Sequence, residues 1–185
     1  MKELSLNILD ISMNSVKAGA ENILIKLVET ADTLTLTIKD DGCGMSEDTV
    51  KNVMNPFYTT RTTRKVGLGV PLLKLAAEQT GGGITISSVS EKDNPDEHGT
   101  TVTAEFFKNH LDFTPLGDIV STVTTLIQGS PDREWRFEHI LDGGSVELDT
   151  KELREILGDV PLDNYEVIKW IEGYLREGYE SVNNV

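Results

Sequence analysis

The sequence predicts an α+β protein: a two-layer α/β sandwich, in which a mixed sheet carries helices on one face, with a small α/β unit added at the C-terminal end. Three observations lead to this prediction. Helix-like and strand-like runs follow one another in the order α, β, β, α, α, β, β over residues 1–107. The strand-like runs alternate apolar and polar residues, so one face of the sheet is buried and the other faces water. Residues 108–185 then change in charge and begin a new series of elements.

The first helix and the first two strands have the clearest patterns. Apolar residues recur at helical spacing between Leu4 and Lys17, and Ala18-Gly19-Ala20 ends the pattern. Strands are expected at residues 22–28 and 33–39. In the second strand leucine and isoleucine alternate with threonine, which is typical of a half-buried strand.

Proline and glycine punctuate the rest of the first unit. Ser46 is a suitable N-cap for a short helix, and Pro56 ends that helix. Glycines 81–83 stop the following helix. The expected elements are a helix over 46–55, a loop over 56–69, a helix from Pro71 to Gln79, and strands at 84–89 and 100–107.

Residues 108–185 form the expected second unit. This segment carries 7 basic and 16 acidic residues, and it contains no repeat and no low-complexity tract. Its expected elements are a helix over 116–128, strands around 135–141 and 145–148, and helices that start at Thr150 and Asn164. We therefore divide the chain into a domain over residues 1–107 and an acidic unit over residues 108–185.

Composition narrows the classes of function. A net charge of -14 disfavours binding to nucleic acid or to an anionic membrane. No apolar run approaches the roughly 18 residues that span a bilayer. The single cysteine excludes an internal disulfide framework, and Asp10 falls where a secretory leader needs apolar residues. We expect a cytoplasmic protein.

Three polar residues of the first helix suggest a binding wall. Asp10, Asn14 and Lys17 follow at helical spacing, so they form one stripe along the helix. The side-chain oxygens of the aspartate and the asparagine are of the kind that Mg²⁺ takes alongside substrate phosphates. The alternative is a solvated helix face, and the spacing alone does not decide between the two.

A second motif follows a strand directly. In the run from Asp40 to Met45, DDGCGM, two glycines allow a tight turn and the close approach of a flat ligand. The carboxylate at the end of the strand would face that ligand. An ordinary turn after a strand is the alternative.

The third motif is electrostatic. Between Asp48 and Glu78 the chain has no acidic residue, although Lys51, Arg61, Arg64, Lys65 and Lys74 fall there. Three of these lie in the loop just before the glycine turn Gly67-Leu68-Gly69, and a helix begins just after it. A helix start offers free amides and a positive dipole end, so together these features favour an anion site over a plain flexible loop.

These elements, in this order, resemble the boxes of the GHKL superfamily of Bergerat-fold ATPases, whose members are DNA gyrase B, the ninety-kilodalton heat-shock chaperones, MutL and histidine kinases. DISMNSVKAGA looks like the N box and DDGCGM like the first glycine box. NPFYTT with VGLGVPLLKLAAEQTGG is similar to the F box and second glycine box of histidine kinases, and HGTTV looks like the last glycine box. The resemblance covers residues 1–107 and implies a histidine kinase-like ATPase domain.

The resemblance implies that Mg²⁺ and ATP bind to the residues that match its boxes. Asn14 would hold Mg²⁺ against the phosphates, Asp40 would accept a hydrogen bond from the adenine amino group, and Thr100 would help at the same edge. The other residues that the resemblance places around ATP are Lys17, Gly42, Gly44, Met45, Phe57, Arg61, Arg64, Lys65, Gly67, Leu68 and Gly69.

Asp10 departs from the pattern of the superfamily. Hydrolysing members carry a glutamate four residues before the Mg²⁺ asparagine, as the base that activates water. Aspartate is shorter by one methylene, which retracts the carboxylate by about 1.5 Å. A misplacement of about 1 Å can slow a reaction on the order of a hundredfold. We expect Asp10 to be the catalytic residue of a slow hydrolysis.

The sequence thus predicts a Mg²⁺-ATP-binding protein of the histidine kinase-like ATPase type, acting as a slow ATPase or a nucleotide-dependent switch. One alternative is a protein kinase that transfers phosphate to a serine or histidine of a partner and resembles the anti-sigma-factor kinases. Another is a non-hydrolysing interaction module. A protein partner is expected at the acidic C-terminal unit, and the sequence leaves the oligomeric state open.

Overall fold

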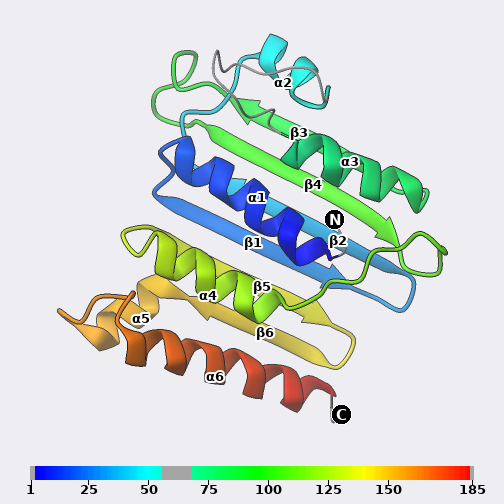
Figure 1. Cartoon of the computed structure of the whole chain (residues 1–185). Coiled ribbons are helices and arrows are strands. Elements are labelled where there is room, and N and C mark those ends of the chain that lie inside the picture. The colour runs from blue at the N-terminus through cyan, green and yellow to red at the C-terminus, as the bar shows by residue number, and fades with distance from the viewer. Residues whose placement is uncertain (1–2, 56–67, 184–185) are drawn as a thin grey trace.

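The computed structural model describes residues 3–55 and 68–183 (Figure 1). In these residues the helices are α1 (Leu4–Lys17), α2 (Glu47–Val53), α3 (Gly69–Gln79), α4 (Ile119–Gly129), α5 (Thr150–Leu157) and α6 (Tyr165–Asn183). The strands are β1 (Asn22–Glu29), β2 (Thr33–Asp40), β3 (Gly83–Val89), β4 (Gly99–Phe107), β5 (Glu134–Leu141) and β6 (Gly144–Asp149).

The strands form one mixed sheet in the order β3-β4-β2-β1-β5-β6. All neighbouring strands run antiparallel except β1 and β5, which pair in parallel with Ile25 opposite Phe137. Figure 1 shows α1, α3, α4 and α6 on one face of this sheet. The predicted two-layer α+β sandwich with helices on one face is therefore confirmed.

Alternation along the strands places the core between the sheet and the helices. Ile25 of β1, Leu36 of β2 and Phe137 of β5 are buried on the helix side, and α1 packs Ile8 and Ile11 against that side. Each such side chain contributes about 1.5–3 kcal/mol of hydrophobic free energy relative to an exposed one. The core fixes α1 on the sheet, and its polar stripe faces outward.

The elements after residue 107 continue the same sheet. β5 extends the sheet from β1, and α4 lies beside α1. The backbone amides of Leu4 and Ser5 donate to the carbonyls of Pro115 and Leu116 at 2.9 and 2.8 Å. The division of the chain at residue 107 stays a prediction, and the acidic segment shares one hydrophobic core with the residues before it.

Most element boundaries agree with the sequence patterns, and two helix starts differ by two or three residues. α3 begins at Gly69 rather than Pro71, because Leu68 already has helical dihedral angles and a proline is tolerated in the first turn. α4 begins at Ile119 rather than Leu116, because the Asp118 side chain caps it by accepting from the amide of Ser121. In the described residues no helix combines the length and the apolar character needed to cross a membrane.

Candidate nucleotide-binding site

Asp40 ends β2 with its carboxylate held from three directions. The residue is 8% exposed. Its Oδ2 accepts from the hydroxyl of Ser15 on α1 at 2.5 Å, and its Oδ1 accepts from the amides of Gly42 at 3.0 Å and Thr100 at 3.3 Å. An ionised carboxylate has about four lone-pair sites. Three donors leave it able to accept one more hydrogen bond in a fixed direction.

The neighbouring Asp41 has a structural role. Its carboxylate accepts from the amides of Glu21 and Asn22 at 2.7 and 2.9 Å, and from the Asn22 side chain at 2.7 Å. Partial burial opposes ionisation, but these hydrogen bonds outweigh it and lower the pKa of Asp41. The two adjacent aspartates thus have different roles. Asp41 fixes the start of β1, whereas the Asp40 carboxylate can still accept one more hydrogen bond.

The two glycines after Asp41 are required by the packing of the loop. A Cβ at Gly42 would lie 2.8 Å from the Cβ of Ala18, and one at Gly44 would lie 1.8 Å from the carbonyl oxygen of Val89. Gly44 also has a φ of +64°, which favours glycine. The glycines let the loop press against α1 and the end of β3, and this contact holds the Asp40 region in place.

Ser88 and His98 support this loop; no sequence pattern marked Ser88, and His98 is the first residue of the HGTTV run. The Ser88 hydroxyl accepts from the amide of Met45 at 2.8 Å and lies 2.8 Å from the Thr100 hydroxyl. The Nδ1 of His98 lies 2.6 Å from the carbonyl oxygen of Gly42. β3 therefore holds the backbone of Met45, and β4 sets Thr100 beside Asp40.

The start of α3 meets the polar stripe of α1. A Cβ at Gly69 would lie 3.4 Å from the Cβ of Asp10 and 3.8 Å from the side-chain nitrogen of Asn14. Asp10, Asn14 and Lys17 are exposed, and so is Leu68, the N-cap residue of α3. The fold thus brings together the N-terminal end of α3, with its free amides, and the carboxylate and amide of α1.

Several predicted site residues lie outside the described residues: Phe57, Arg61, Arg64, Lys65 and Gly67. A cavity of about 300 Å³ includes Asp40 and Asp41 in its lining, together with Lys39, Arg136 and Lys151. Neither the α1 stripe nor Gly69 lines this cavity. We therefore place the candidate site on the α1 side of Asp40 and not in this cavity.

The donors available for a metal ion fit Mg²⁺ only together with phosphate. Within residues 3–55 and 68–183, no group of three or more His, Cys, Asp or Glu side chains is placed to hold a metal ion. Mg²⁺ is usually bound by one or two protein oxygens plus substrate phosphates and water. Asn14 is exposed and its side chain lies close to the start of α3, so its amide oxygen is a ligand of the kind that this arrangement requires.

The sequence model of the histidine kinase-, DNA gyrase B-, and HSP90-like ATPase family matches residues 1–111. The chain therefore belongs to this family, and it carries a GHKL histidine kinase-like ATPase domain.

Its curated relatives are longer proteins. It is 27% identical over 92 residues to sporulation kinase C of Bacillus subtilis, covering 50% of this chain and 21% of that protein. It is 30% identical over 92 residues to sporulation kinase E of the same organism, covering 50% of this chain and 12% of that protein. It is 36% identical over 85 residues to the haem sensor protein HssS of Staphylococcus saprophyticus, covering 45% of this chain and 17% of that protein. The chain thus spans about a fifth or less of these relatives.

Solved structures show where else the fold occurs. The Aquifex aeolicus MutL ATPase domain complexed with ADP matches with a TM-score of 0.55 at 12% identity, covering 85% of this chain and 69% of that one. The N-terminal domain of a DNA repair protein matches with a TM-score of 0.54 at 16% identity, covering 80% and 52%. Each match covers more of this chain than residues 1–111, so the shared fold includes part of the C-terminal segment.

Proposed function

We propose that this chain binds ATP with Mg²⁺ at the Asp40 site and acts as a nucleotide-dependent switch with slow hydrolysis. The observation that carries the proposal is the Asp40 carboxylate, buried yet left with room for one donor by Ser15, Gly42 and Thr100. An adenine amino group is a donor of the required kind, and a charged acceptor strengthens such a bond.

The phosphates would lie at the other end of the site. The proposal places them at the N-terminal end of α3, near Leu68 and Gly69, because free amides and the helix dipole favour anions there. Asn14 would contribute its oxygen to Mg²⁺, and Lys17 follows on the same exposed stripe. Mg²⁺ would neutralise charge on the phosphates as they are transferred. Gly42, Gly44, Met45 and Thr100 would shape the adenine end. Arg61, Arg64, Lys65 and Gly67 would complete the phosphate end, and Phe57 would anchor the lid over ATP.

Asp10 is the residue proposed to activate water. It is exposed on α1 beside Gly69, on the side of the helix where the phosphates are placed. Its side chain is shorter than glutamate, so we expect a low hydrolysis rate that keeps the ATP-bound state populated. Slow turnover suits a switch, since a bound phosphate can order nearby segments until it is released.

Phosphate transfer to a protein is the second candidate, and the names of the curated relatives favour it. Two of them are sporulation kinases. A phosphate-accepting histidine within this chain has little support, because His110 lies in the turn after β4, 3.6 Å from Asp112 and outside any helix. A transfer reaction would therefore need a partner as acceptor. The third candidate, an interaction module without turnover, would bind ATP and release no phosphate.

The experiment that tests the proposal is a calorimetric titration of the chain with ATP, with and without Mg²⁺. We expect saturable binding that strengthens when Mg²⁺ is present. An absence of binding under both conditions would refute the proposal. Labelled phosphate on an added partner protein would favour the kinase alternative. We further propose a cytoplasmic location and a protein partner at the acidic C-terminal unit.

A further inference from the structure

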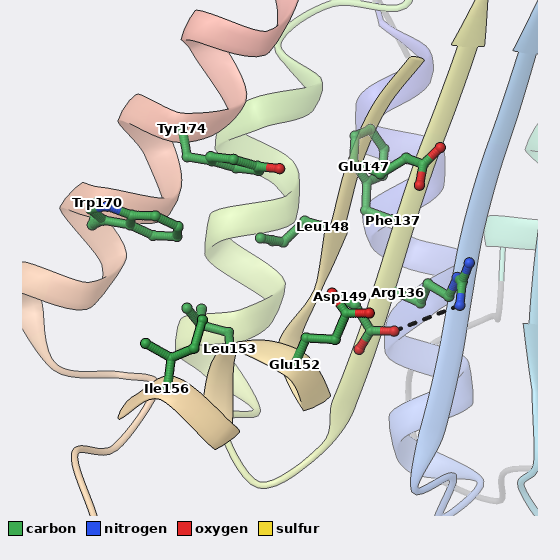
Figure 2. A pocket seen from close by; sticks show the side chains of 10 residues that line it. All are labelled: Arg136, Phe137, Glu147, Leu148, Asp149, Glu152, Leu153, Ile156, Trp170 and Tyr174. Carbon is green, nitrogen blue, oxygen red and sulfur yellow. Dashed lines mark ion pairs between the residues drawn. The ribbon is translucent and has the colours of Figure 1, made fainter. Parts of the chain in front are cut away.

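A groove of about 290 Å³ lies at the β6 end of the sheet, where β5, β6, α5 and α6 meet (Figure 2). Two strands, β1 and β5, separate β6 from the β2 strand that carries Asp40. The groove is lined by Arg136, Phe137, Glu147, Leu148, Asp149, Glu152, Leu153, Ile156, Trp170 and Tyr174. None of these residues belongs to the candidate nucleotide site.

The groove reaches the edge of the sheet. Successive residues of a strand point to opposite faces, and the groove touches Leu148 on the helix face as well as Glu147 and Asp149 on the open face. Among the described residues, β6 is the last strand of the sheet and pairs with β5 alone. Such an edge presents backbone donors and acceptors to which an extended segment can pair.

One wall of the groove is apolar and exposed. Trp170 and Tyr174 project from α6 toward Leu148, and Ile156 rises from α5 (Figure 2). The two aromatic rings are stacked with centroids 5.2 Å apart, and they are 52% and 45% exposed, while Ile156 is 82% exposed. Single exposed apolar residues are ordinary, but a cluster of this kind beside a groove marks an interaction site.

The other wall is acidic. Glu147 and Glu152 lie along it with Asp149, and neither glutamate forms a salt bridge with a described residue. The one cation in the lining, Arg136, is already paired with Glu138 at 2.6 Å and with Asp149 at 3.7 Å. The groove therefore has two glutamates that form no salt bridge with a described residue next to an aromatic pair.

We propose that this groove docks an extended, basic segment of a partner protein, which adds a strand to the edge of β6. Its lysine or arginine side chains would pair with Glu147 and Glu152, and an apolar side chain would rest on Trp170. Charge complementarity selects this occupant, because a second copy of a chain with net charge -14 would be repelled. The inference deepens the partner role proposed above and rests on it.

The first test is a selection from phage-displayed random dodecapeptides on the immobilised full chain, with counter-selection on a Glu147→Lys, Glu152→Lys, Trp170→Ala variant. We expect enriched peptides with a net positive charge and at least one apolar residue. Selection of acidic peptides, or of none that depends on the groove, would overturn the proposal.

The second test measures the affinity of one enriched peptide for single variants. Trp170→Ala should weaken it by about tenfold or more, as for a central aromatic anchor. Glu147→Lys with Glu152→Lys should weaken it by a similar factor and reduce its salt dependence. Glu180→Lys on α6 and Leu111→Ala, both exposed outside the groove, should bind as the wild type does. Equal losses in these controls would contradict the assignment.

Four further measurements test the docking proposal against its alternatives. Peptide binding should slow amide exchange in residues 144–149, and a peptide methylated on alternate backbone nitrogens should not bind. Unchanged binding of the methylated peptide would overturn strand addition. A concentration-dependent dimer that Trp170→Ala abolishes would assign the groove to a second copy. ATP titrations of the same variants distinguish the docking proposal from the proposed ATP binding, because ATP binding without peptide binding refutes only the docking proposal.

Discussion

The exchange Asp40→Asn tests the adenine assignment while changing few atoms. The Asn side chain keeps one oxygen for the amides of Gly42 and Thr100, and its NH₂ group can donate to the Ser15 hydroxyl, which now has to accept. The fold should therefore persist. The charged acceptor for the adenine amino group is lost. Hydrogen bonds to charged groups contribute about 1.5–3 kcal/mol, against about 0.5–1.5 for neutral ones.

If the Asn NH₂ group also faces the adenine amino group, two donors meet, and the expected loss of ATP-binding free energy is about 2–3 kcal/mol. That corresponds to about 30- to 150-fold in Kd, enough to abolish binding in an ordinary calorimetric titration. Asp41→Asn is the matched control, because Asp41 holds Glu21 and Asn22 instead. It should lower stability and leave ATP affinity unchanged. An unaltered affinity in Asp40→Asn would refute the adenine assignment.

Three other perturbations have expected outcomes. Asn14→Ala should remove the Mg²⁺ dependence of ATP binding, and a titration that still responds to Mg²⁺ would reject Asn14 as a ligand. Gly44→Ala places a Cβ 1.8 Å from the Val89 carbonyl oxygen at a residue with a positive φ. Urea unfolding should show that the free energy of unfolding falls by about 3 kcal/mol. Gly83→Ala, whose Cβ would have nothing within 4 Å, should lower it far less. Burial lowers the pKa of the His139 imidazole more than Glu29 raises it. As the pH falls, the unfolded chain therefore binds this proton at a higher pH than the folded chain does. The free energy of unfolding should decrease as the pH drops below about 6.5. The urea midpoint of His139→Gln should fall less than that of the wild type over that pH range. An equal pH dependence of the two midpoints would contradict the role given to His139.

Local patterns in the sequence predicted the elements well, and the structure shows why. α1 has the predicted bounds, because its apolar spacing and the turn after Lys17 are both local signals. The Ser46 cap of α2 is present, with its hydroxyl accepting from the Thr49 amide at 3.3 Å. These features depend on residues within one turn of each other, so the sequence displays them directly.

Features that depend on distant residues could not be predicted. Nothing local indicates that β5 pairs in parallel with β1, since the pairing is decided by the shared core that α4 and α6 complete. Ser15 looks like any helix serine until the fold sets it 2.5 Å from Asp40. Ser88 supports the glycine loop for the same reason, because β3 returns beside β4 only in the folded sheet.

The structure of the glycine motif could be predicted from the sequence only in part. The DDGCGM run predicted a tight turn with a carboxylate at the end of a strand, and Asp40 does end β2. The sequence did not distinguish Asp40 from Asp41, which the resemblance alone separated. Nor did it show that a side chain at Gly44 would meet Val89. The site roles proposed for these residues stay predictions until ATP binding is measured.

Slow hydrolysis of bound ATP is tested by a single-turnover assay with the protein in excess over γ-labelled ATP and Mg²⁺, for the wild type and for Asp10→Ala. We expect the label first to bind to the protein as ATP and then to appear slowly as free phosphate. Asp10→Ala should retain bound ATP and release little phosphate. Label that never associates with either protein would refute ATP binding by this chain.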